Sequence, residues 1–275
     1  SGLIGGNGNV NVTGQSLANQ GGQIVAKNNL VIAADQGADN TNGTISAGQD
    51  ITLNHSAGNL INAGGAISAG GILDIRAAAV DNTGGNLAAN QNINLTAQSL
   101  NGNGQAIAGQ DLNLTLSGDL TSGTGGKLQA NRDVNLNAAG AVLNQGNITG
   151  VQNVTVTGSN ITNDTGATTA AGNALSISTS DDVNNNGQLS GNNVTINSRN
   201  ISNTGTVTAK SLSVQANTIT NSASAVMNST GDVGLNASGL TNQGTIYAQG
   251  NANISSTGTL TNSGVLAAAQ NTNLA

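Results

Sequence analysis

A repeat of about 20 residues runs through the chain and constrains its fold more than any other feature. In the stretch GTISAGQDITLNHSAGNLINAG, Ile45 precedes the aliphatic pair Ile51 and Leu53. Leu60 follows this pair, and the pattern restarts at Ile67. The equivalents of Ile45 are Ile4, Ile24, Ile67, Leu87, Ala106 or Ile107, Leu128, Ile148, Thr169, Leu189, Val207, Val226 or Met227, Ile246 and Leu266. A period that persists in this way indicates a solenoid, in which each unit buries its apolar side against the next.

The spacing inside each unit predicts strands. Aliphatic residues alternate with polar ones, as in Ile51/Leu53 and Val154/Val156, so one face of each strand is buried and the other is exposed to solvent. A helix would need apolar residues at i+3 and i+4, and the high content of Gly, Asn, Ser and Thr disfavours helices. We therefore expect about three short strands per unit, separated by Gly and Asn at the corners.

These strands predict an all-β right-handed parallel β-helix with about 20 residues and one unit per turn, and about 13 turns in all. The 275 residues would form a single repeat domain, 1–275, which we interpret as a fragment of a longer filament. Without Phe or Trp the core must be narrow. The right-handed form is favoured because parallel crossovers are overwhelmingly right-handed. A left-handed helix of hexapeptides would not accommodate the seven-residue gap between Leu53 and Leu60.

Polar residues also recur in columns. One column follows the third-strand aliphatic residue by two positions: Asn19, Asn62, Asn82, Asn144, Asn163, Asn185, Asn203, Asn221, Asn242 and Asn262. Stacked amides at this position can hydrogen-bond to the amides above and below. A second column precedes the paired aliphatics: Asn9, Asn29, Asp50, Asn92, Asp111, Asp133, Asn153, Asn193, Asp232 and Asn251. We expect these side chains to accept hydrogen bonds from nearby backbone N–H groups in turns.

The units AGQDITLNHSAGNLINAGGAISAG, AGQDLNLTLSGDL and NQGTIYAQGNANI resemble the haemagglutinin repeats of filamentous-haemagglutinin-type exoproteins. The resemblance covers essentially the whole chain. It implies a right-handed β-helical stalk or adhesion segment of a large adhesin or contact-dependent inhibition exoprotein of Gram-negative bacteria. The amino-terminal secretion domain of that family carries Asn-Pro motifs, which are not visible here because the chain contains no Pro. No tail resembles a carboxy-terminal toxin.

The same resemblance implies two-partner (type V) secretion through an outer-membrane transporter and display at the bacterial cell surface. It allows a host or bacterial cell-surface receptor or a glycan as ligand. We expect a monomer without a transmembrane segment, because no apolar run approaches 18 residues. Nucleic acid is not an expected partner, since the chain has six basic residues against twelve acidic ones and almost no aromatic residues.

The alternative is a polysaccharide-binding or polysaccharide-cleaving β-helix. The outward position between the paired aliphatics should carry the catalytic acids of such an enzyme, yet Asp74 is its only acid. Arg76 stands beside Asp74 on the same strand and is expected to pair with it as an exposed ion pair. We expect no lyase or hydrolase activity.

Other candidate sites are weak. His55 is the only histidine, has no Cys or second His to complete a metal shell, and is interpreted as a solvated turn residue. The stretch GGNGNVNV is similar to a calcium-binding repeat but has Asn in place of Asp and is not iterated. Residues 35–43, with Asp35 and Asp39, break the third-strand rule and are interpreted as a surface loop, as is the segment near Asp181 and Asp182. We therefore expect no catalytic, cofactor-binding or metal-binding residues, and no cofactor.

Small-angle X-ray scattering tests the predicted shape. About thirteen turns with a rise of roughly 4.8 Å each give a body near 60 Å long. The scattering curve should therefore show an elongated particle. A compact sphere would exclude the β-helix.

Overall fold

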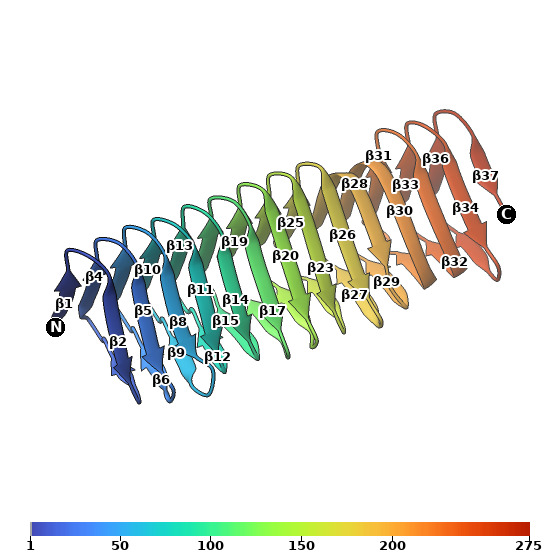
Figure 1. The fold of residues 1–275 in the computed structure, drawn as a ribbon. Coiled ribbons are helices and arrows are strands. Elements are labelled where there is room, and N and C mark those ends of the chain that lie inside the picture. Colours follow the sequence, from blue (N-terminus) through green and yellow to red (C-terminus); the bar gives the residue numbers. More distant parts are fainter. Residues whose placement is uncertain (1) are drawn as a thin grey trace. The chain divides into compact units, whose positions relative to one another are not determined.

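The computed structural model describes residues 2–275, and within this range the chain forms strands and turns without a helix. The chain divides into two compact units, one ending at Gly140 and the other running from Ala141 to Ala275. In each unit, parallel strands stack as a β-solenoid with about 20 residues per turn (Figure 1). The turns number about 14, close to the predicted thirteen.

The first unit has three strands in nearly every turn, as the alternation of aliphatic residues predicts. The first strands of its turns are β1 (Leu3–Gly6), β4 (Gln23–Ala26), β7 (Thr44–Ala47), β10 (Ala66–Ala69), β13 (Asn86–Ala89), β16 (Gln105–Ala108) and β19 (Lys127–Ala130). The second strands are β2 (Val10–Gly14), β5 (Leu30–Ala34), β8 (Ile51–His55), β11 (Leu73–Ala77), β14 (Ile93–Ala97), β17 (Leu112–Leu116) and β20 (Asp133–Ala138). The third strands are β3 (Leu17–Ala18), β6 (Gly37–Asp39), β9 (Asn59–Ile61), β12 (Ala79–Asp81), β15 (Ser99–Gly102) and β18 (Leu120–Ser122).

The second unit follows the same plan, but three of its strands continue around corners. The first strands are β22 (Asn147–Gly150), β25 (Thr168–Ala171), β31 (Val226–Ser229), β33 (Thr245–Ala248) and β36 (Val265–Ala268). The second strands are β23 (Asn153–Gly158), β26 (Ala174–Thr179), β34 (Ala252–Ser256) and β37 (Thr272–Leu274). The third strands are β21 (Val142–Asn144), β24 (Ile161–Asn163), β27 (Asp182–Asn185), β29 (Asn200–Asn203) and β35 (Leu260–Asn262). The strands that span corners are β28 (Gln188–Asn197), β30 (Thr206–Asn221) and β32 (Val233–Asn242).

Equivalent residues of successive turns pair in parallel, so the core consists of stacked aliphatic columns. Ile24 pairs with Ile45, and Ile45 with Ile67, and all three are fully buried. In the turn where two residues compete for this column, Ala106 faces the core and the larger Ile107 points outward. The register of the stack, rather than side-chain size, therefore decides which residue is buried.

The corner after the third strand requires a left-handed backbone in several turns of the first unit. Gly21, Gly64 and Gly84 have φ near +60° there, and Asn42 holds the same position with φ 54°. Asn is the residue other than Gly that tolerates this conformation best. Asn42 thus adopts the same corner geometry as the glycines of the other turns.

Buried asparagines form a hydrogen-bonded ladder at this corner of the first unit. The Nδ2 atom of Asn19 donates to Oδ1 of Asn40 (2.7 Å), Asn40 to Asn62 (2.7 Å), and Asn62 to Asn82 (2.8 Å). The predicted column omits Asn40 because the sequence predicts a loop at residues 35–43, and this prediction is wrong. Ala38 takes the aliphatic position in β6, and Asn40 behind it is completely buried.

The ladder stops at Gly102, which has φ 120° and no side chain. In the same register, Ser122 follows Gly102 in the next turn. Asn82 Nδ2 therefore donates to the carbonyl oxygen of Gln105 (2.9 Å) instead of to another amide. Gly102 and Ser122 thus interrupt the amide column while the backbone ladder continues.

The second unit contains a ladder of the predicted residues. Asn163 donates to Asn185 (2.9 Å), Asn185 to Asn203 (2.7 Å), and Asn203 to Asn221 (2.8 Å). The bonds Asn144 to Asn163, Asn221 to Asn242 and Asn242 to Asn262 extend it in both directions. Asn203 is fully buried and also donates to the carbonyl oxygen of Val226 (3.3 Å). The predicted amide column is confirmed.

The side chains of the second polar column form hydrogen bonds between adjacent turns. Oδ1 of Asn29 accepts from the backbone N–H of Asp50 (3.1 Å), and Oδ1 of Asp50 accepts from Ile72 (2.8 Å). Asp232 accepts in the same way from Asn251 (2.7 Å). These side chains accept from the backbone as predicted, but their donors lie in the following turn. They therefore link adjacent turns.

Replacing Asn203 with Ala should destabilise the second unit. It would leave the Nδ2 group of Asn185 and the Oδ1 atom of Asn221 without their buried partners, at a cost of about 1–3 kcal/mol. The outward Thr195→Ala substitution should change the free energy of unfolding by no more than about 0.5 kcal/mol. Urea unfolding measures both changes.

Hydrogen exchange tests whether this damage is local. In a solenoid each turn contacts only its neighbours, so the turns beside residue 203 should open faster than distant ones. Equal costs for the two substitutions, or uniform loosening of the unit, would contradict the ladder's role.

Candidate functional site

A chain of outward amides runs over the second strands of the first unit. Nδ2 of Asn94 donates to Oδ1 of Asp74 (2.6 Å), Asn113 donates to Asn94 (2.9 Å), and Asn135 donates to Asn113 (2.9 Å). The expected pairing of Asp74 with Arg76 is wrong, since no ion pair joins them in the described part of the chain and the Asp74 carboxylate binds Asn94 instead. Asp74 is thus an acceptor in an outer ladder.

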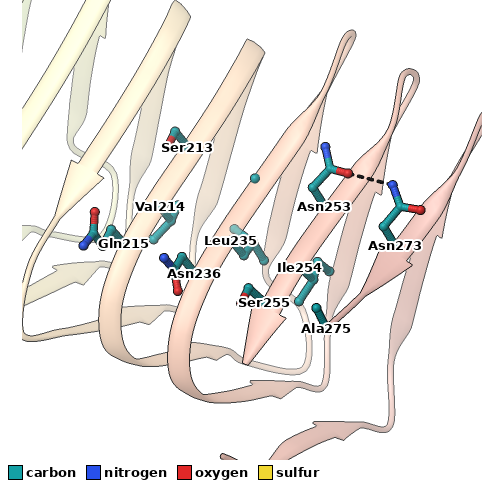
Figure 2. Close-up of a pocket in the computed structure, with 11 residues that line it drawn as sticks. Ser213, Val214, Gln215, Leu235, Asn236, Asn253, Ile254, Ser255, Asn273 and Ala275 are labelled. Atoms are coloured by element: carbon teal, nitrogen blue, oxygen red, sulfur yellow. Dashed lines mark hydrogen bonds between the residues drawn. The ribbon is translucent and has the colours of Figure 1, made fainter. Parts of the chain in front are cut away.

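The equivalent face of the second unit has a shallow depression of about 360 Å³ (Figure 2). Gly234 in β32 supplies no side chain to the outward row there, between Ser213 in β30 and Asn253 in β34. Figure 2 shows Asn253 beside Asn273, which donates to it through Nδ2 (2.8 Å). The side chains that line this depression are neutral, so they offer hydrogen bonds but no charge.

Several carboxylates bind partners within the protein. Arg132 forms a bidentate ion pair with Asp111, and its guanidinium lowers the pKa of the Asp111 carboxyl below the usual value. Asp39 accepts from the hydroxyl of Thr41 (2.6 Å) and from its backbone N–H (2.9 Å), and the hydroxyl bond is the main cause of a lowered Asp39 pKa. Residues 37–39 form strand β6, so Asp39 does not lie in the loop that was predicted.

Arg199 lies between Asp181 and Asp182 of the preceding turn. Its guanidinium nitrogens are 3.0 Å from Oδ1 of Asp181 and 3.2 Å from Oδ1 of Asp182. The Asp181/Asp182 pair therefore binds a cation that the chain itself provides. Across residues 2–275, no three His, Cys, Asp or Glu side chains are close enough together to hold a metal ion.

His55 is not the solvated turn residue that the sequence suggested. It ends strand β8, is completely buried, and lies in a core column with Ala34 below and Ala77 above. Its Nδ1–H donates to the carbonyl oxygen of Ala34 (3.1 Å), whereas Nε2 has no partner among the described residues. Burial lowers the pKa of the imidazole, and the bond to Ala34 offsets this only in part. The continuing alternation Ile51, Leu53, His55 was a signal for this inward position.

The corner between second and third strands is concave, and each unit has a groove there. In the first unit the groove measures about 550 Å³ and follows β8, β11, β14 and β17 past their last residues. In the second unit a groove of about 470 Å³ includes Arg199. Sequence reasoning missed both grooves, because the concavity depends on how the chain turns at this corner. Each groove contains one arginine, Arg76 in the first and Arg199 in the second.

Stacked parallel strands and axial amide ladders define a β-solenoid repeat protein. The haemagglutinin repeat model matches residues 1–54, 32–97, 56–122, 110–187 and 228–275. The chain belongs to the haemagglutinin repeat family. No curated protein and no solved structure matches it significantly.

The buried imidazole predicts acid sensitivity. Because the pKa of His55 is lower in the folded state than the ordinary 6.5, the unfolded state takes up a proton first as the pH falls. The contribution of neutral His55 to stability is complete above pH 6.5 and is lost as the pH falls through the folded pKa. The midpoint of urea unfolding should therefore fall between pH 7.5 and the folded pKa of His55.

His55→Leu should flatten this dependence. Leu116 already occupies the same core column two turns beyond Ala77, so a leucine suits the site. The exposed Lys127→Gln variant is the control, and its unfolding midpoint should depend on pH as in the wild type. If the unfolding midpoint of His55→Leu depended on pH as in the wild type, another titrating group would be the cause of the acid sensitivity.

Proposed function

We propose that the chain is a stalk segment of a large secreted bacterial surface adhesin, a stiff spacer that supports cell contact. The observation that carries this proposal is the repetition of one set of inter-turn bonds, exemplified by Asn185–Asn203 and Asn203–Asn221. Membership of the haemagglutinin repeat family, whose members are structural adhesins, supports the same role.

Such a stalk derives its strength from nearest-neighbour contacts. Each turn adds an aliphatic layer, backbone ladder bonds and one or two polar axial bonds to the turn before it. The length of the body can therefore change by whole repeats without redesign of the core. This property suits a protein whose task is to hold a module at a distance.

We propose a bacterial cell-surface location, reached through an outer-membrane transporter of a two-partner system. The support is the family, which is typically secreted or surface-exposed. No helix in residues 2–275 is long and apolar enough to cross a membrane. We further propose that the 275 residues act as one monomeric repeat domain within a longer filament.

A polysaccharide-cleaving enzyme is a weaker proposal for this chain. Its expected outward column has Asp74 as its only acid, and that carboxylate accepts a hydrogen bond from Asn94. General acid and base catalysis on a glycosidic bond commonly uses two carboxylates flanking it. The outward face favours a structural role over hydrolysis.

Force measurements on the chain held by its two ends test the stalk proposal. Because each turn is bonded to its neighbours, unfolding should proceed in steps that release whole turns. Each turn of about 20 residues would add roughly 66–72 Å of extended chain. Asn203→Ala should lower the force of some steps, and Thr195→Ala should lower none. Extension without resolved resistance would argue against a load-bearing stalk.

A further inference from the structure

The imidazole of His55 replaces a backbone hydrogen bond at one corner of the first unit. At other corners after a second strand, the carbonyl oxygen of the inward residue accepts from a backbone N–H of the next turn: Ser117 donates to Ala97 (3.0 Å), Ala139 to Leu116 (2.9 Å) and Thr257 to Ala237 (3.1 Å). At Ala34 the Nδ1–H of His55 donates instead (3.1 Å), and Ser56, the residue equivalent to Ser117, does not donate to this oxygen in the described chain. A titratable side chain thus closes this corner.

The two backbone segments at this corner, residues 34–37 and 55–58, are packed directly against each other, and we call them the His55 corner. The backbone N–H of Gly58 donates to the carbonyl oxygen of His55 (2.8 Å). A Cβ atom at Gly58 would lie 2.1 Å from the carbonyl carbon of Gln36 in the turn before. The imidazole therefore joins two segments that leave no space for solvent between them.

The imidazole lies in the core, away from every charged side chain of the strands around it. The strands stacked on β8 are β5 and β11, and the third strands of these turns are β6, β9 and β12. Charged residues on these strands occupy outward positions, and those just beyond the strand ends are exposed: Asp39, Asp74, Arg76, Asp81, Asp35 and Asp50. The Nε2 atom has no hydrogen-bond partner among the described residues. A second proton on the ring would therefore place a charged N–H in the core without an acceptor.

We propose that His55 is a pH-sensitive switch: in acid the imidazole takes up a proton and moves into solvent, and the His55 corner opens while the other turns stay folded. Burial lowers the pKa of His55, so the closed corner binds the proton more weakly than the open corner does. As the pH falls from 6.5 to the folded pKa, the ratio of open to closed corners therefore rises. The opening stays local because each turn contacts only its neighbours. This switch is distinct from a loss of global stability and does not depend on the proposed stalk function.

Amide hydrogen exchange at pH 7.5 and pH 5.0 tests the switch. The amides of Gly58 and Ala78 report on the corner, because Gly58 donates to His55 and Ala78 donates to Gly58 (both 2.8 Å). Their protection factors, which correct for the intrinsic effect of pH on exchange, should be about 3- to 30-fold lower at pH 5.0. The upper limit follows from an open-state pKa of about 6.5. Ser117, which follows Leu116 at the equivalent corner, should keep its protection within about twofold.

Two variants without a titratable ring at this position are the matched tests. His55→Gln keeps an N–H donor for Ala34, and His55→Leu introduces the side chain that Leu116 already places in this column. In either variant the protection of Gly58 should agree at the two pH values within about twofold. Asp35→Asn removes the carboxylate that follows Ala34 and should respond to pH like the wild type.

The titration of the ring itself gives a second readout. The nuclear magnetic resonance signal of the His55 Cε1–H should shift with a midpoint below pH 6.5. The proposal is overturned by a midpoint at or above 6.5, by unchanged protection of Gly58 at pH 5.0, or by an equal fall at Ser117. A fall that persists in both His55 variants, or one that is lost in Asp35→Asn, would also overturn it. The ring midpoint and the comparison with Ser117 need no variant, so they decide the proposal even if a substitution prevents folding.

Discussion

The hydrogen bond from one asparagine amide to the equivalent amide of the next turn is the interaction on which this solenoid depends. In each described bond of the buried asparagine ladders, Nδ2 donates to Oδ1 of the later residue, as from Asn19 to Asn40 and from Asn203 to Asn221. Asn offers a donor and an acceptor on a side chain short enough to stay inside the corner. A register shift of one residue would place a neighbour such as Ser202 or Thr204 in the position of Asn203 and would leave the buried amides without their partners. The ladder thus fixes the register of the strands. The aliphatic columns alone would specify this register only through the size and shape of their side chains.

A narrow core follows from the same stacking. Because each inward position sits on its own equivalent, neighbouring turns must offer side chains of compatible volume, and Ile, Leu, Val and Ala satisfy this. His55 is one exception, between Ala34 and Ala77, where two small neighbours leave room for an imidazole. The space is filled, but Nε2 is left without a hydrogen bond among the described residues. The core therefore accommodates this imidazole at the cost of one unmade hydrogen bond.

Most of the fold could be predicted from the sequence, because the period places equivalent residues in columns. The ladder at Asn163, Asn185 and Asn203 followed from spacing alone. The predicted column omits Asn40 because Ala38, a weakly hydrophobic residue, stands where other turns have Leu, Ile or Val. The groove at Arg76 could not be predicted, since the curvature of the corner and the pairing of Asp74 with Asn94 depend on three-dimensional geometry. The sequence repeat predicts the features that all turns share, whereas the candidate site depends on residues that differ in a single turn.

The position of glycine relative to the ladder asparagines affects which asparagines are most prone to deamidation. Asparagine followed directly by glycine loses its amide most readily, since the next backbone nitrogen can then reach the side-chain carbonyl carbon. The ladder residues are followed by bulkier residues, as in Asn62-Ala63 and Asn203-Thr204, with glycine one position later. Asn42-Gly43 and Asn103-Gly104 are sequences of the vulnerable kind, and each begins with an exposed asparagine outside the ladder. Deamidation would thus accumulate at the surface of the protein while its internal hydrogen-bond column stays chemically intact.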